Sequence, residues 1–255
     1  MKIARSFGAL GFAALVSLGC AAQAADFSPD QKSAIEGIIR EYLLKNPEVL
    51  QEALGELERR QQETQRSAQR EAVESEKQVL FSSPNDAVVG NQKGNATLVV
   101  FFDYNCPYCK KAANELDELM KADPNLRVVL KEFPVVRPPD SLEVARIALA
   151  ARQQLKDDKY FDFHMRLMTA KGLVNKERAL EVAKEMKLDI AKLTKDAEAE
   201  EVRSTIQSTV RLGDKLGISG TPSFVVGDAV ISGAVGNEPL RQALAAVRAC
   251  GKATC

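Results

Sequence analysis

The sequence predicts an α/β fold that follows an amino-terminal helical segment. The 255 residues are 45% hydrophobic and 27% charged, which is ordinary globular composition. From about residue 83, patterns typical of a strand, a helix, a strand, a long helical block, a hairpin and a final helix follow one another. The segment before it shows helical periodicity only. We therefore expect three parts: a leader at 1–24, a helical module with its stalk at 25–82, and an α/β domain at 83–255.

The leader has the pattern of a secretory signal peptide. Lys2 and Arg5 precede an apolar run over residues 7–19, which is too short to span a bilayer of about 30 Å. The small residues Ala22 and Ala24 around Gln23 fit a cleavage site, and cleavage after Ala24 would deliver the mature chain to the periplasm. It would also leave four cysteines, an even number in an oxidising compartment. An alternative is that Cys20 is lipidated.

Two amphipathic helices, each with an apolar stripe, are expected in the module at 25–82. The first stripe follows the spacing of an amphipathic helix and consists of Ile35, Ile38, Ile39, Tyr42 and Leu43. Asn46-Pro47 breaks this helix and begins a second one, whose stripe consists of Val49, Leu50, Ala53, Leu54 and Leu57. From residue 56 to residue 77 half of the side chains are charged, as in a solvated stalk. We favour an oligomerisation module in which stripes from several chains share one core; a helical hairpin or a stem docked on its own domain is the alternative.

The α/β domain is expected to have a buried central strand. Residues 97–103, TLVVFFD, form a continuous apolar run, as expected for a strand that is covered on both faces. A helix at 106–122 and a strand at 126–133 follow, and 141–216 is helical throughout. Two short strands surround the Gly227-Asp228 turn, and an amphipathic helix at 238–249 ends the domain.

Two cysteines open the helix that follows the buried strand. Cys106 and Cys109, in Cys106-Pro107-Tyr108-Cys109, are three residues apart and lie on one helical face, so their sulfurs can bond. Cys106 is placed where free backbone N–H groups and the helix dipole favour a thiolate, with Lys110 and Lys111 nearby. We expect Cys106 to be the nucleophile and Cys109 the resolving thiol. The alternatives are an inert disulfide, or half of a zinc site completed by the last two cysteines.

The second element is Gly220-Thr221-Pro222-Ser223-Phe224. A proline just before a strand can hold a cis peptide bond, and the Thr221 carbonyl beside it is a place where an extended substrate can pair. Alone, this pattern indicates only a turn.

Together these elements resemble the thioredoxin superfamily, and among its members the secreted Dsb disulfide oxidoreductases and isomerases. FFDYNCPYCKK and GTPSF are similar to that family's redox motif and cis-proline loop, and the resemblance covers about residues 83–250. It implies a thioredoxin fold with a helical insertion at about 139–216. It also implies that Cys106 exchanges disulfides, that Cys109 resolves them, and that Thr221-Pro222 faces both. We expect substrate contacts from Pro107, Tyr108, Thr221 and Pro222.

The resemblance also bears on the branch of the family. CPYC with a threonine before the proline is closer to the DsbC and DsbG isomerases than to DsbA. DsbA-type oxidases often carry an acid six residues before the first cysteine, where this chain has Val100. The amino-terminal module is similar to that of trimeric ScsC-like proteins. The resemblance implies secreted cysteine-containing clients, a membrane-bound thiol reductase as electron donor, and a homo-oligomer, with a trimer favoured over a dimer.

Composition excludes other classes of function. Lys and Arg number 35, as do Asp and Glu, so the basic excess of a general nucleic-acid binder is missing. A single histidine, His164, excludes a site of several imidazoles, and we expect it to be a packed or surface side chain. We expect neither a cofactor nor a metal.

Three other side chains remain to be placed. Cys250 and Cys255 are expected to form a structural disulfide, although a second redox pair or two free thiols are alternatives. Glu132 is either a proton shuttle for Cys109 or a solvent-facing side chain. Overall, the sequence favours a periplasmic disulfide isomerase; the alternatives are a monomeric DsbA-type oxidase and a redox-inactive, chaperone-like or metal-binding protein.

Overall fold

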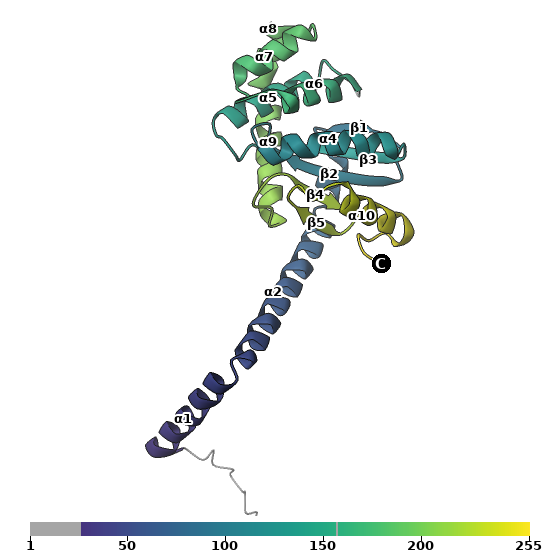
Figure 1. Cartoon of the computed structure of the whole chain (residues 1–255). Helices are drawn as coiled ribbons and strands as arrows, with labels where there is room; N and C mark the ends of the chain where they lie inside the picture. The colour runs from purple at the N-terminus through teal and green to yellow at the C-terminus, as the bar shows by residue number, and fades with distance from the viewer. Residues whose placement is uncertain (1–26, 157) are drawn as a thin grey trace, which may run out of the picture. The chain divides into compact units, whose positions relative to one another are not determined.

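A computed structural model describes residues 27–156 and 158–255 (Figure 1). By its contacts the chain divides into two compact units, one that ends at Glu58 and one that runs from Arg59 to Cys255. The expected signal peptide and Cys20 lie outside the described residues. Within those residues, no helix has both the length and the apolar character needed to cross a membrane.

The first unit consists of α1 (Pro29–Lys45) and the start of α2 (Glu48–Ser75). Ser28 and Gln31 form a capping box, in which the Ser28 hydroxyl accepts from the Gln31 amide at 3.3 Å and the Gln31 side chain accepts from the Ser28 amide at 2.9 Å. The predicted break is confirmed. The Asn46 amide and side chain both donate to the Tyr42 carbonyl at 2.9 Å, and α1 ends at Lys45. Most residues of the expected apolar stripes are solvent-exposed, Leu43 and Val49 are partly exposed, and α1 buries none of its residues.

The second unit is built on a five-stranded sheet in the order β1-β3-β2-β4-β5. The strands are β1 (Ala87–Gly90), β2 (Ala96–Phe102), β3 (Leu126–Glu132), β4 (Ser223–Val226) and β5 (Ala229–Ser232). β2 and β3 are parallel and every other neighbouring pair is antiparallel. This is the predicted thioredoxin fold, with the apolar run as its central strand.

Helices cover both faces of the sheet, which explains why β2 is apolar without alternation. Leu98, Val100 and Phe102 face a core shared with α4 (Pro107–Ala122) and α10 (Asn237–Cys250). Val99 and Phe101 face the opposite core. That core includes Val73 of α2, Leu80 of α3 (Lys77–Ser82) and Leu212 of α9 (Glu200–Lys215). The end of α2 and the whole of α3 therefore belong to the packing of the second unit.

A helical block lies between β3 and β4, as predicted. Its helices are α5 (Asp140–Ala151), α6 (Asp158–Thr169), α7 (Lys176–Glu185), α8 (Ile190–Ala197) and α9. α5 and α9 share a small core of Ala145, Leu149, Val202 and Ile206. α6 contacts α4, so the block closes over the helix that carries the two cysteines.

Candidate active site

Cys106 occupies the N-cap position of α4. β2 ends at Phe102, three residues turn, and the helix begins at Pro107, whose lack of an N–H group is harmless at this position. The Cys106 backbone is extended, with φ −84° and ψ 117°, and its Sγ accepts a hydrogen bond from the Cys109 amide at 3.4 Å. The sulfur takes the place of the side-chain oxygen of a typical N-cap. The position predicted from the order of strand, cysteine pair and helix is confirmed.

The two thiols are free and differ strongly in acidity. The Cys109 thiol donates a hydrogen bond to the Cys106 sulfur and, against the opposing effect of burial, lowers the pKa of Cys106 from 9.0 to about 6; the Thr221 side chain and the amides of Cys109 and Tyr108 add to this. Burial, reinforced by the neighbouring Cys106, raises the pKa of the Cys109 thiol. At neutral pH, Cys106 is therefore a thiolate and Cys109 a thiol. The helix amides contribute as predicted, but the neighbouring thiol contributes most.

The segment before β4 lies against this pair. The Thr221-Pro222 peptide bond is cis. The Thr221 carbonyl oxygen lies 3.1 Å from the Cys106 sulfur, where it accepts a hydrogen bond from the S–H group of the neutral thiol. Pairing of β4 with β2 brings the two segments together across 115 positions of sequence. The Pro222 carbonyl accepts from the Gly233 amide at 2.8 Å, which anchors the loop from the other side.

The predicted site residues therefore meet, but their exposure differs. Cys106 is 4% exposed and Cys109 2%, whereas Tyr108 is 67% exposed and Pro107 is also at the surface. Only the edge of the Cys106 side chain can be reached by a partner. Tyr108 presents a large apolar ring beside it.

The turn before Cys106 is held by two side chains that the sequence analysis did not single out. The Asp103 carboxylate accepts from the Asn105 amide at 2.7 Å, from the Ser141 hydroxyl at 2.8 Å and from the Val136 amide at 2.8 Å. Asn105 exchanges two hydrogen bonds with the Val174 backbone, at 2.9 and 2.8 Å. The available signal was the pair of Asx residues in DYNC, a residue type that forms side chain-to-backbone bonds in turns.

The two lysines after the motif contact other groups than the Cys106 sulfur. The Lys110 ammonium donates to the carbonyls of Ala170 at 2.6 Å and Gly172 at 3.2 Å, so it ties α4 to the loop after α6. Lys111 lies 3.8 Å from Glu115 on the surface. Neither lysine is among the main causes of the lowered Cys106 pKa.

A buried polar cluster lies behind the turn. The Tyr104 hydroxyl lies 3.1 Å from Glu132 Oε1 and 3.1 Å from His164 Nδ1. Burial raises the pKa of Glu132 well above 4.5 and lowers the pKa of His164 to about 3, so the imidazole is neutral. His164 is packed against Phe102, as expected of a core histidine. The solvent-facing alternative for Glu132 is wrong, because the helices close over this end of the sheet and leave the side chain buried.

Cys250 and Cys255 are bonded to each other, with their Cα atoms 6.2 Å apart. The disulfide predicted for the carboxyl end is confirmed, and the alternative of two free thiols is wrong. Both sulfurs are occupied, so the alternative of a zinc site shared with Cys106 and Cys109 is wrong.

Known proteins with this arrangement are thiol–disulfide enzymes. Residues 97–245 match the family described as DSBA-like thioredoxin domain, and residues 31–63 match the copper resistance protein ScsC N-terminal domain. A thioredoxin-like oxidoreductase from Silicibacter pomeroyi DSS-3 is 45% identical, with a TM-score of 0.64; the match covers 68% of this chain and 98% of that one. ScsC of Proteus mirabilis, in a transitional conformation, is 27% identical, with a TM-score of 0.62, over 88% of this chain and 97% of that one.

A curated relative is also a thiol–disulfide interchange protein. DsbA of Bordetella pertussis is 27% identical over 153 residues, which are 56% of this chain and 68% of that protein. The chain also matches curated sodium/proton antiporters, of whose length it spans about a fifth. Since the first family match covers more than half of the chain, the chain belongs to the DSBA-like thioredoxin domain family of thiol–disulfide oxidoreductases.

Proposed function

We propose that the chain is a periplasmic thiol–disulfide isomerase that acts on cysteine-containing secreted proteins. The observation that carries the proposal is the pairing of an acidic Cys106 with a protonated Cys109 beside the cis Thr221-Pro222 bond. Thiolates, not thiols, attack disulfides, so at neutral pH only Cys106 is ready to react.

The proposed exchange proceeds through a mixed disulfide between Cys106 and a client protein. The Cys106 thiolate attacks one sulfur of a client disulfide, and the other client sulfur leaves as a thiolate. That thiolate can attack a second disulfide of the client and displace another client thiolate. When the displaced thiolate attacks the client sulfur that is bonded to Cys106, the client is left with rearranged disulfides and Cys106 leaves as a thiolate. If Cys109 loses its proton and attacks Cys106 instead, the client leaves reduced and the enzyme is oxidised. A membrane-bound thiol reductase then returns two electrons and two protons to the pair.

Four residues would hold the client beside Cys106. The exposed ring of Tyr108 and the adjacent Pro107 offer apolar contact. The Thr221 carbonyl, 3.1 Å from the sulfur, receives no hydrogen bond from the Cys106 thiolate and so offers an acceptor to a backbone N–H of an extended client chain. Pro222 fixes the direction of this segment.

The amino-terminal unit would assemble several such sites into one homo-oligomer, with a trimer favoured and a dimer as the alternative. Ile38, Leu44 and Leu54 are 67%, 73% and 60% exposed, and α1 buries no residue of its own. Exposed apolar surface of this extent marks an interaction site. Linked sites raise the effective concentration of thiols around a bound client, which favours isomerisation.

Refolding of scrambled ribonuclease tests the enzyme directly. The full mature chain should restore nuclease activity, and Cys106→Ser should not. A full-length Cys106→Ser variant with equal activity would refute the catalytic assignment.

A truncation tests the role of assembly. It should remove residues 25–58 and no more, because Val73 and Leu80 are part of the second unit's core. We expect a monomer that still exchanges disulfides but isomerises poorly. Ile38→Glu with Leu54→Glu should give the same result in the full chain, and Lys32→Glu, an exposed charge change on α1, should leave the mass unchanged. An unaltered sedimentation mass for the truncated chain would contradict oligomerisation through this unit.

The second candidate is a monomeric oxidase of DsbA type, which the acidic Cys106 and the match to DsbA favour. An oxidase should form disulfides in a reduced client and should perform equally well after the truncation. A redox-inactive chaperone, the remaining alternative, would leave Cys106 unreactive toward iodoacetamide at pH 6.

A further inference from the structure

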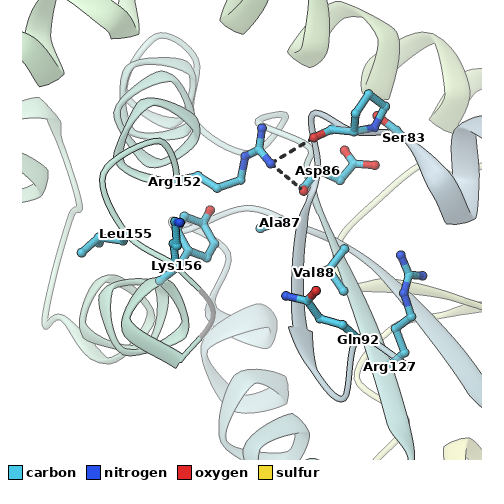
Figure 2. Close-up of a pocket in the computed structure, with 11 residues that line it drawn as sticks. Ser83, Asp86, Ala87, Val88, Gln92, Arg127, Arg152, Leu155 and Lys156 are labelled. Atoms are coloured by element: carbon cyan, nitrogen blue, oxygen red, sulfur yellow. Dashed lines mark hydrogen bonds between the residues drawn. The ribbon is translucent and has the colours of Figure 1, made fainter. Parts of the chain in front are cut away.

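A polar pocket of about 320 Å³ lies at the sheet edge formed by β1. Ser83, Asp86 and Val88 form one wall, and Arg152, Leu155 and Lys156, at the end of α5 and beyond, face them (Figure 2). Cys106, Cys109, Thr221 and Pro222 are not among the residues that line it. The pocket is therefore separate from the candidate active site.

Positive charge dominates the lining. Its cationic side chains are Arg127, Arg152 and Lys156, and its one carboxylate among the described residues is Asp86. Asp86 forms a buried ion pair with Lys131, in which both side chains are at most 3% exposed. Lys131 therefore neutralises the charge of Asp86, and the charges of the three lining cations are left over.

Both arginines donate to backbone carbonyls and keep further donors. Arg152 Nη1 donates to the carbonyls of Pro84 at 3.0 Å and Asp86 at 3.2 Å (Figure 2), and Arg127 Nη1 donates to Phe81 at 2.9 Å. A guanidinium group has five N–H donors. Arg152 Nε is buried and has no partner. These contacts fix the guanidinium without neutralising it.

An oxyanion is the ligand that this chemistry suits. Guanidinium groups bind carboxylates and phosphates through paired hydrogen bonds, and the interaction is stronger where water is partly excluded. Burial lowers the pKa of Arg127, as expected for a partly desolvated cation. The pocket is at the lower end of the size range of small-molecule sites, and Leu155 adds an apolar surface.

We propose that this pocket binds a small oxyanion, a phosphate or a compound with several carboxylates, through Arg152 and Lys156. Arg152 supplies a planar positive charge that is already oriented by its carbonyl contacts. Lys156, which is exposed, supplies a second, movable positive charge. The inference goes beyond the proposed function and does not depend on it.

Calorimetric titration of the full chain with citrate, and separately with inorganic phosphate, tests the proposal at constant ionic strength set by sodium chloride. We expect saturable binding of one anion per chain. Lys156→Gln should weaken it about two- to fivefold, as removal of one exposed charge pair does. Arg152→Gln should weaken it at least about tenfold, because hydrogen bonds to a charged group are lost. Cys106→Ser should bind as the wild type does, which separates this test from that of the proposed function.

Lys159→Gln is the matched control, since it removes an equivalent exposed charge nearby that does not line the pocket. Saturation by phosphate but not citrate would assign the pocket to a compact tetrahedral anion, and the reverse to a carboxylate ligand. Saturation by neither anion, or equal weakening by Lys156→Gln and Lys159→Gln, would overturn the proposal. The lysine variants settle the question even if Arg152→Gln fails to fold.

Discussion

Replacing Cys109 with alanine should raise the pKa of Cys106. The thiol of Cys109 is the largest cause of the lowered Cys106 pKa, and alanine removes this donor. The amide of residue 109, 3.4 Å from the sulfur, remains in place. Cys109→Ser is the matched control, because its hydroxyl can still donate.

The size of the effect follows from the strength of the lost hydrogen bond. A hydrogen bond to a charged group contributes about 1.5–3 kcal/mol, which corresponds to about one to two pKa units. The Cys106 pKa should therefore rise from about 6 to roughly 7–8. At pH 7 the ionised fraction would fall from about nine-tenths to between about a half and a tenth.

The same shift makes the stability of the reduced protein depend on pH. The folded state binds the Cys106 proton more weakly than the unfolded state, whose pKa is near 9.0. The thiolate therefore stabilises the fold increasingly as pH rises from about 6 to 9, by roughly 1 kcal/mol at pH 7, and contributes little below pH 6. Urea unfolding of reduced wild type and reduced Cys106→Ser across this range should reproduce the difference.

Thiolate absorbance near 240 nm, followed against pH, measures the Cys106 pKa in each variant. Iodoacetamide alkylation at pH 6–7 tests access as well, since Cys106 is only 4% exposed. A titration midpoint near 8.5 for the wild-type Cys106 thiol would refute the lowered pKa and everything derived from it. A midpoint that stays at about 6 in Cys109→Ala would show that the amides, not the neighbouring thiol, hold the charge.

Three further predictions concern stability, each measured by urea unfolding. Lys131→Met should lower the free energy of unfolding by about 3–5 kcal/mol, because it leaves the buried Asp86 carboxylate unpaired; a loss below about 1 kcal/mol would contradict the ion pair. Glu132 has a raised pKa, so the wild type should lose stability as pH rises above about 4.5 while Glu132→Gln does not; parallel curves would show that the carboxyl is solvated. Cys250→Ser should cost about 2 kcal/mol, the chain-entropy value for so short a loop, and should leave the Cys106 pKa unchanged.

Local sequence was sufficient for the elements that carry the dithiol. An apolar run, a cysteine at the N-cap and Pro107 at the first helical position specify a strand, a turn and a helix within a dozen residues. The break after Lys45 is equally local, because Asn46 caps one helix by bonding to the Tyr42 carbonyl four residues back. Such features depend on neighbours in the chain, and the sequence displays them directly.

The supports of the site depend on distant partners and were not predicted. Asp103 reaches Ser141 and Asn105 reaches Val174, across 38 and 69 positions. Nothing in the motif itself identifies these partners. The sequence did not decide whether Glu132 is buried or faces solvent, for a related reason. Its burial requires the helical block to close over the end of β3 and to bring His164 to Tyr104.

The position of the buried acid bears on the direction of the proposed reaction. Val100, six residues before Cys106, is apolar and buried, whereas Glu132 lies on β3 beside Phe102. Burial and the neighbouring Cys106 raise the pKa of the Cys109 thiol, so the resolving thiol keeps its proton. A protonated thiol attacks disulfides slowly, because the reactive form is the thiolate. The mixed disulfide between Cys106 and a client should therefore persist long enough for the client's own thiolate to attack, which favours isomerisation over net reduction.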